Sequence, residues 1–219
     1  MAKKNRIKSQ DRIQSGNKFA KQGNKSQTAA NTGNNLKVKM ELISDAIFGN
    51  GMSVPGGEDI AVQTDENGFP YLKGSTLKGI FREQLENHLA WIDYDTNIAG
   101  ILLGNEGDDS DDARKLVFPD MRLPMSVTSR VLAEIGDDKD IVTDSMTNIR
   151  TFTAIDENGM TKEHSLRQAR CVNKGLTFYG IIKCKPQDQG LVSEVLTEIK
   201  WVGSMRNRGF GKVKFSIEQ

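Results

Sequence analysis

Apolar residues follow the two-residue spacing of a half-buried β-strand near the beginning and the end of the chain. The first predicted strand is LKVKMELIS, residues 36–44, and the last is KVKFSI, residues 212–217. Between them, LTFYGIIKCK at residues 176–185 is the strongest strand candidate. KLVFPDMRL at residues 115–123 is also predicted to be extended. Its Pro119 places it near a sheet edge, because proline has no N–H for the strand ladder.

Two other segments have the period of an amphipathic helix. One begins at Ser75, with Ser75 or Thr76 expected as its cap, and the other lies within QGLVSEVLTEIKWV, residues 189–202. Their predicted apolar faces are Leu77, Ile80, Phe81, Leu85 and Leu89 in the first helix and Leu191, Val192, Val195, Leu196 and Ile199 in the second. The order strand, helix, strand, strand, helix, strand predicts an α+β, ferredoxin-like (RRM-like) β-α-β-β-α-β core. In such a core two helices cover one face of an antiparallel sheet.

A polar excursion at about residues 144–172 interrupts this core. Asp156 to Gly159 supply turn residues, so the segment is predicted to form a protruding β-hairpin. Four of its side chains could wedge between bases or contact a nucleic-acid backbone: Met146, Asn148, Arg150 and Phe152. The alternative is a mobile surface loop without such a role.

Positive charge is concentrated at the N-terminus, although the formal charge of the 219 residues is only +1. In residues 1–35 a single acid, Asp11, stands against Lys3, Lys4, Arg6, Lys8, Arg12, Lys18, Lys21 and Lys25. The rest of this stretch is polar and of low complexity, so it cannot bury a core. We therefore predict a basic arm, 1–35, and one folded domain, 36–219. The arm is expected to be either disordered or ordered along the phosphates of RNA.

Several classes of protein and site are excluded. The chain has neither the apolar segment of a signal peptide nor the roughly 18 consecutive apolar residues of a membrane span, so we expect a soluble, cytoplasmic protein without membrane partners. The residues Cys171, Cys184, His88 and His164 lack the spacing of a zinc site. His88 lies beside the apolar stripe of the first helix and is expected to pack there. The acidic run at 108–112 lacks the glycine and glutamate of a calcium loop.

Two glycine-rich loops are the main candidates for a site. The first, GSTLKG at residues 74–79, has the glycine spacing of a nucleotide-binding P-loop. Ile80 and Phe81 stand where Lys and Ser or Thr are required, so we reject a nucleoside triphosphatase. The helix start still offers N–H groups, hydroxyls and cations to an anion, from Lys73, Gly74, Ser75, Thr76, Lys78 and Arg82. An ordinary capped helix with surface lysines is the alternative.

The second loop is GSMRNRGFG, residues 203–211. Glycines let a backbone approach a ligand closely, and arginines can fork onto phosphate or stack on a base. The residues concerned are Gly203, Arg206, Arg208, Gly209 and Gly211. In the predicted fold, the loop before the first helix and the loop after the second can approach each other over the sheet. Together they are stronger evidence for a site that binds phosphate or stacks on a base than either loop alone.

These motifs resemble those of the RAMP superfamily. DENGFPYLKGSTLKGIFREQLE is similar to the signature D-x-x-G-x-P-Y-I-P-G-S-S-L-K-G-x-x-R, and RNRGFGKVKF is similar to the C-terminal glycine-rich loop of that family. ILLGNEGDDSDDARKLVFPDMRL is similar to the segment between them, and the landmarks follow the family's order across residues 36–219. Within the superfamily, GGEDIAVQTDENGFPYLKGSTLKG most resembles the backbone subunit of type III CRISPR effector complexes, as in the Csm complex.

The resemblance implies a prokaryotic protein that binds CRISPR RNA (crRNA) and forms a filament with copies of itself or related RAMP subunits. It also implies a large polymerase-like subunit, a subunit that caps the 5′ end of the guide, and small subunits as partners. Asp59 matches the aspartate required for cutting complementary target RNA, and it would hold a hydrated Mg²⁺ ion weakly. The polar excursion matches the family's thumb, which pushes a base pair apart beside that aspartate.

Some positions depart from the family pattern: Ile47, Ala61, Lys73, Ser204 and Arg206. They indicate a divergent branch, such as a type III-D-like one. We expect a Mg-dependent endoribonuclease subunit and keep two alternatives. The first is a non-catalytic crRNA-binding scaffold. The second is a RAMP enzyme that processes precursor crRNA by metal-free acid–base catalysis, which is less well supported because neither His88 nor His164 is near the glycine-rich loops in the sequence.

Overall fold

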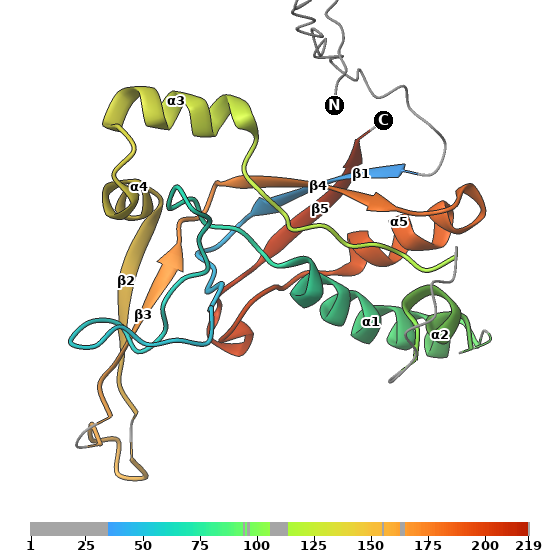
Figure 1. Cartoon of the computed structure of the whole chain (residues 1–219). Helices are drawn as coiled ribbons and strands as arrows, with labels where there is room; N and C mark the ends of the chain where they lie inside the picture. The colour runs from blue at the N-terminus through green and yellow to red at the C-terminus, as the bar shows by residue number, and fades with distance from the viewer. Residues whose placement is uncertain are drawn as a thin grey trace, which may run out of the picture. The chain divides into compact units, whose positions relative to one another are not determined.

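The computed structural model describes residues 35–93, 95, 97–105, 114–154, 156–162 and 165–218 (Figure 1). The predicted basic arm, apart from Asn35, the acidic run at 108–112 and His164 lie outside the described residues. Among the residues that are described, no helix is both long and apolar enough to cross a membrane.

A three-stranded antiparallel sheet, in the order β4–β1–β5, forms the main part of the fold. Its strands are β1 (Asn35–Leu42), β4 (Thr177–Lys183) and β5 (Val213–Glu218), so three predicted strands are confirmed, with their ends shifted by one or two residues. β1 lies in the centre because it pairs with both neighbours. The alternating apolar residues of β1, Leu36, Val38, Met40 and Leu42, are all buried. The two-residue period of the sequence therefore marks the core face of this strand.

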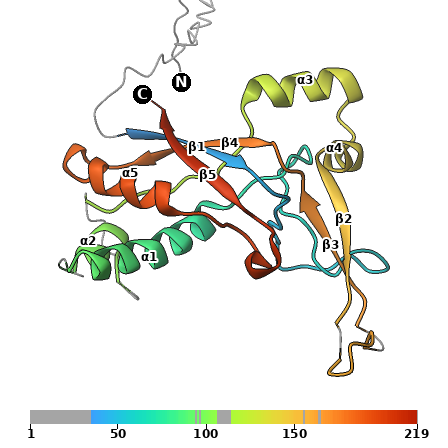
Figure 2. The same cartoon turned by 180° about the vertical axis from the view of Figure 1, so that it is seen from behind.

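Helices α1 (Gly74–Trp91) and α5 (Gln189–Glu198) lie on the same side of the sheet, as both Figure 1 and Figure 2 show. The residues that they contribute to the core are Leu77, Phe81, Leu85 and Leu89 from α1 and Val192, Val195 and Leu196 from α5. Helix α2 (Asn97–Leu103) packs on α1, and a short 3₁₀ helix, η1 (Pro186–Asp188), leads into α5. Both predicted amphipathic helices are confirmed.

The fourth predicted strand is not continuous. Residues 117–122 run beside β4 but pair with it only through isolated bridges, from Val117 to Lys183 and from Arg122 to Tyr179. Pro119 lies between the two bridges and has no N–H to donate, which explains the interruption. We call residues 117–122 the edge segment. The protein therefore has a mixed α/β fold with antiparallel sheets, in which the main sheet has three strands and this edge segment.

Helices α3 (Met125–Ile135) and α4 (Lys139–Met146) are not predicted by the sequence patterns above. α3 has no buried residue, and α4 buries only Val142 and Met146, so neither has the continuous apolar stripe of a core helix. Asp138 caps α4 by accepting hydrogen bonds from the N–H groups of Asp140 (3.0 Å) and Ile141 (3.2 Å). This cap is the one local signal in the sequence that indicates α4.

Strands β2 (Thr147–Phe152) and β3 (Arg167–Val172) form a separate two-stranded antiparallel sheet within the polar excursion. Figures 1 and 2 show this hairpin extending away from the main sheet. A small second apolar cluster holds its base, in which Ala169 and Cys171 of β3 pack with Ile47, and Phe152 and Phe210 pack around them. The role of this hairpin as a thumb stays a prediction.

The start of α1 differs from the prediction, because neither Ser75 nor Thr76 caps the helix. Instead, the carboxylate of Asp120 accepts a hydrogen bond from the Gly74 N–H (2.9 Å). Gly74 packs directly on the edge segment, since a Cβ at this position would lie 2.2 Å from the carbonyl oxygen of Phe118. The cap therefore comes from a residue distant in the sequence, and only the folded chain supplies it.

We expect Gly74→Ala to destabilise the protein by about 1–3 kcal/mol, because the added Cβ collides with backbone. Gly79→Ala is the matched control in the same helix. No atom outside the helix lies within 4 Å of its Cβ position, so this substitution should stabilise the protein by about 0.5–1 kcal/mol. Urea unfolding of both variants measures the difference. Equal effects would contradict the packing of α1 on the edge segment.

Candidate functional site

The start of α1 presents Lys73, Ser75 and Thr76 to solvent, whereas Gly74 is buried. One of the N–H groups expected to hold an anion is already occupied, because Asp120 accepts the hydrogen bond of Gly74. The helix start is thus partly filled by a carboxylate of the protein itself. An external anion would meet chiefly the three exposed side chains.

Lys78 and Arg82, the two cations predicted to follow this start, have different surroundings. The Arg82 guanidinium donates hydrogen bonds to the carbonyl oxygens of Leu103 (3.3 Å) and Gly104 (2.7 Å), at the C-terminal end of α2. Arg82 therefore satisfies carbonyl groups that the end of a helix leaves unpaired. Lys78 is half-buried and makes no ion pair in the part of the chain that the structure describes. Contact of either residue with a guide RNA stays a prediction.

Glycines shape the second loop, residues 203–211, through close packing. A Cβ on Gly203 would lie 2.4 Å from the carbonyl oxygen of Ile47, and a Cβ on Gly211 would lie 1.8 Å from that of Val202. Both glycines, and Gly209, have positive φ angles, which other residues rarely adopt. The loop therefore needs these glycines for its own fold. The side chains of Arg206 and Arg208 are exposed on it.

The structure brings the two glycine-rich loops together at one pocket of about 270 Å³. Lys73 and Thr76 line it from the start of α1, and Gly203 and Arg206 line it from the second loop. Ile47, which precedes the Gly49 turn, forms part of the same lining. The two motifs thus face a common space, as the sequence pattern predicts.

The base of the hairpin meets the second loop on the side of Phe152. The rings of Phe152 and Phe210 pack edge to face, with centroids 5.5 Å apart. Two pockets, of about 320 and 380 Å³, share Phe152 and Arg208 in their lining. The other cations that line them are Arg150, Lys162, Arg167 and Lys174. We call these seven residues the hairpin–loop surface.

Sequence reasoning misses four members of the hairpin–loop surface: Lys162, Arg167, Lys174 and Phe210. None of the three cations belongs to a glycine motif, and Phe210 reads as an ordinary apolar residue within one. The sequence alone does not show that these side chains lie around Arg208, because the fold brings them together. Cations interleaved with aromatic rings are the composition expected of a surface that binds single-stranded nucleic acid.

Asp45 holds part of this surface in place. Its carboxylate accepts hydrogen bonds from the Arg150 guanidinium (2.7 Å), the Lys174 N–H (3.0 Å) and the Asn148 amide (3.3 Å). Burial would raise the pKa of Asp45, but these hydrogen bonds outweigh it and hold the pKa below its ordinary value. Arg150 therefore stays exposed yet oriented by an ionised carboxylate.

Two of the four predicted thumb residues do not reach the surface as expected. Met146 ends α4 and is buried in the main core, so the prediction that it wedges between bases is wrong. Asn148 is half-buried, and its amide is bound to Asn173 (2.6 Å) and Asp45. Arg150 and Phe152 remain as the two thumb residues on the hairpin–loop surface.

Asp59 is exposed beside strand β3. Its carboxylate accepts a hydrogen bond from the Gln168 N–H (2.7 Å), and its own N–H donates to the Gln168 carbonyl (2.8 Å). In the described ranges, Asp59 belongs to no group of three metal-ligating side chains. One carboxylate with an oxygen to spare fits a Mg²⁺ ion that keeps most of its water ligands and is weakly held.

A buried ion pair fixes the segment that carries Asp59. Glu58 is only 5% exposed, and its carboxylate binds the guanidinium of Arg170 on β3. Arg170 also binds Asp144 of α4, and its N–H donates to the carbonyl of Ile60 (3.1 Å). Asp59 is therefore held against the hairpin by contacts on both sides of it.

The fold and this arrangement of glycine-rich loops define a class of protein. A family model of the RAMP superfamily matches residues 39–214, which is most of the chain. The protein therefore belongs to the RAMP superfamily. No curated protein matches the chain.

Solved structures with a similar fold include chains of the type III-B Cmr-beta, determined by cryo-EM. One, from the structure bound to cognate target RNA, is 14% identical with a TM-score of 0.62, over 84% of this protein and 96% of that chain. Another, from the apo state, is 14% identical with a TM-score of 0.60, over 84% of this protein and 97% of that chain. At this identity the likeness establishes the fold alone.

We expect Arg170→Met to destabilise the protein by about 3 kcal/mol, because it leaves the buried Glu58 carboxylate without a partner. Arg167→Met is the control on the same strand, where the arginine is exposed and makes no ion pair in the described residues. It should change stability by less than about 0.5 kcal/mol. Urea unfolding provides the measurement, and similar values for the two variants would show that the Glu58–Arg170 pair does not hold this segment.

Proposed function

We propose that this protein is an RNA-binding subunit of a type III CRISPR effector complex. Membership of the RAMP superfamily supports this proposal, as does the fold shared with chains of the type III-B Cmr-beta, one of them in a structure with cognate target RNA. The single observation that carries it is the hairpin–loop surface, where Arg208 and the Phe152–Phe210 pair join the hairpin to the glycine-rich loop.

The chemistry of this surface suits crRNA bound along its phosphate backbone. Arginine can contact phosphate oxygens through two N–H groups at once, and aromatic rings can stack on any base. Such contacts do not depend on the sequence of the RNA. Recognition of a target would then come from base pairing with the guide, as in other RNA-guided systems.

Cleavage of complementary target RNA at Asp59 is the second part of the proposal. Asp59 is hydrogen-bonded to Gln168 of β3, the neighbour of Arg167 on the hairpin–loop surface, and one of its carboxylate oxygens has no hydrogen-bond partner in the described residues. A Mg²⁺ ion held there would favour attack by the 2′-hydroxyl of the target or neutralise the charge that develops. The role of the protein would be to hold the strand in line for that attack.

A non-catalytic scaffold is the alternative, and one observation favours it. The Asp59 carboxylate accepts a hydrogen bond from a backbone N–H and belongs to no group of three metal-ligating side chains among the described residues. It could serve only to attach its segment to β3. Precursor processing through His88 is not supported, because His88 is buried between α1 and α5 and bonded to Glu198.

The proposed partners follow from the family. A backbone subunit would assemble into a filament with copies of itself or related RAMP subunits along one crRNA. The large polymerase-like subunit, the subunit at the 5′ end of the guide and the small subunits would complete the complex. A Csm-like or type III-D-like complex remains the proposed subtype.

The Asp59→Ala variant tests the catalytic part. In the assembled complex with Mg²⁺, we expect the regular cuts in target RNA to disappear while crRNA binding is unchanged, because Asp59 would act on the target only. Glu157→Ala is the control, since it removes an exposed acid of the same excursion. Denaturing gels of labelled target provide the measurement. Undiminished cutting by Asp59→Ala would rule out the catalytic role of Asp59.

The Arg208→Gln variant tests RNA binding independently of cutting. We expect it to weaken crRNA binding and to lower the slope of log affinity against log salt by about one, because one phosphate contact is lost. Arg130→Gln on α3 is the control, since Arg130 is exposed and paired with Glu134 outside the surface (3.0 Å). Fluorescence anisotropy at several salt concentrations measures both slopes. An unchanged slope for Arg208→Gln would contradict the assignment of this surface.

A further inference from the structure

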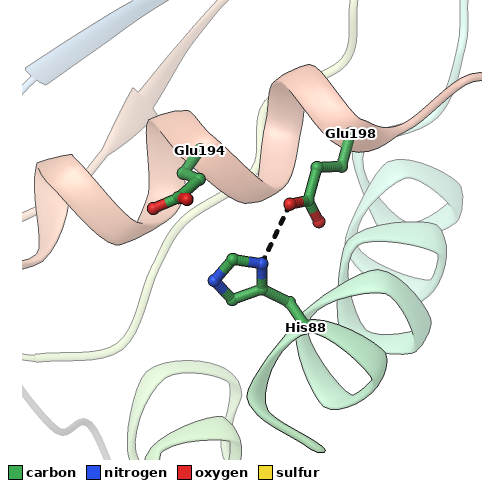
Figure 3. Close-up of side chains that lie close together, drawn as sticks. All are labelled: His88, Glu194 and Glu198. Carbon is green, nitrogen blue, oxygen red and sulfur yellow. Dashed lines mark hydrogen bonds and ion pairs between the residues drawn. The ribbon is translucent and has the colours of Figure 1, made fainter. Parts of the chain in front are cut away.

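Three metal-ligating side chains meet between α1 and α5, away from the residues that line the three pockets described above. His88 comes from α1, and Glu194 and Glu198 come from α5, one helical turn apart. Figure 3 shows the imidazole ring facing both carboxylates across the gap between the two helices. The three ligand atoms lie within 4.8 Å of one another. No spacing in the sequence indicates this group, since His88 and Glu198 are 110 residues apart.

His88 is the fixed member of the group. It is only 8% exposed, and its Nδ1 lies 3.0 Å from a carboxylate oxygen of Glu198. The other oxygen of Glu198 accepts a hydrogen bond from Gln84 (3.0 Å), which also comes from α1. The Nε2 atom of His88 makes no hydrogen bond in the part of the chain that is described. An ion shared by His88 and Glu198 would bind at Nδ1, the nitrogen that faces Glu198, and would take the place of this hydrogen bond.

A hydrogen-bonded His–Glu pair alone would not account for Glu194. Glu194 is exposed, takes no part in the His88–Glu198 bond and has no ion pair among the described residues. Two carboxylates four residues apart on one helix repel each other and destabilise it. A bound cation would turn this repulsion into attraction.

We propose that His88, Glu194 and Glu198 bind one divalent transition-metal ion, of which Zn²⁺ is the best match. Imidazole nitrogen and carboxylate oxygen are both ligands of Zn²⁺, and a set of three protein ligands plus water is a common arrangement for this ion. Two carboxylates would neutralise its charge. Glu194 is the member that must move to close the site, and its exposed side chain is free to do so.

The ion would link the two helices that carry the glycine-rich loops. α1 begins at one wall of the 270 Å³ pocket, and the chain after α5 leads to the other. Zn²⁺ bound between α1 and α5 would therefore hold the spacing of the two walls. This inference does not depend on the proposed function, since it concerns only the folded chain.

Titration of untagged, chelator-treated protein with Zn²⁺ at pH 7.5 tests the site by calorimetry. We expect binding with one ion per chain and a rise in melting temperature when Zn²⁺ is present. Burial raises the pKa of Cys171 and Cys184 to about 11, which disfavours the thiolate forms that would compete for the ion. Absence of saturable binding of one ion would overturn the proposal.

The Glu194→Gln variant separates a metal site from a structural hydrogen bond. It leaves the His88–Glu198 bond in place, so the variant should fold, yet it removes a ligand. Loss of an outer-shell partner costs roughly 10–100-fold in metal affinity, and loss of a ligand should cost at least as much. Glu66→Gln is the control, because Glu66 is also an exposed glutamate and lies outside the group. Equal Zn²⁺ affinity of Glu194→Gln and Glu66→Gln would show that the ion binds elsewhere and overturn the assignment.

Discussion

The backbone of residues 45–49, which begins three residues after the end of the central strand β1, is the connection on which the candidate site depends. Ala46 pairs with Val172 of β3, and the carbonyl of Ile47 accepts a hydrogen bond from Ser204 in the second glycine-rich loop (3.0 Å). The carbonyl of Phe48 accepts one from Gln63, in the segment that follows Asp59 (2.6 Å). Hairpin, loop and Asp59 segment thus share one short stretch of chain. Because β1 is paired on both sides, this stretch is rigidly anchored.

Ion pairs with carboxylates divide the arginines of the hairpin and the second glycine-rich loop into two groups. Asp45 forms an ion pair with Arg150, and Glu58 forms one with Arg170. These two arginines therefore stabilise the attachment of the hairpin to the rest of the fold. Arg167 and Arg208 make no such pair in the described residues and remain available to a ligand. The electrostatic attraction of this surface for an anionic ligand therefore depends on which cations the fold leaves unpaired, more than on the net charge of +1.

Much of the fold could be predicted because it follows from local periodicity. The alternating residues of β1 and the stripe Leu77, Phe81, Leu85 and Leu89 each record which face is buried. The edge segment could be predicted only in part, since Pro119 breaks a strand that the apolar pattern suggests. α3 could not be predicted from an apolar stripe, because none of its residues is buried in the core. The cap of α1 could not be predicted either, because it is supplied by Asp120, 46 residues away from Gly74 in the sequence.

The sequence by itself determined the strands and helices with strong periods, the two glycine-rich loops and the resemblance to RAMP proteins. Only the tertiary structure decided the partners of the charged side chains. Arg150 and Asp45 are 105 residues apart, and Arg170 and Glu58 are 112 apart. His88 is buried, as expected of a packing residue, but its grouping with Glu194 and Glu198 could likewise be found only in the folded chain. Periodicity reports burial along one element, whereas ion pairs and ligand sets form between elements that only the folded chain brings together.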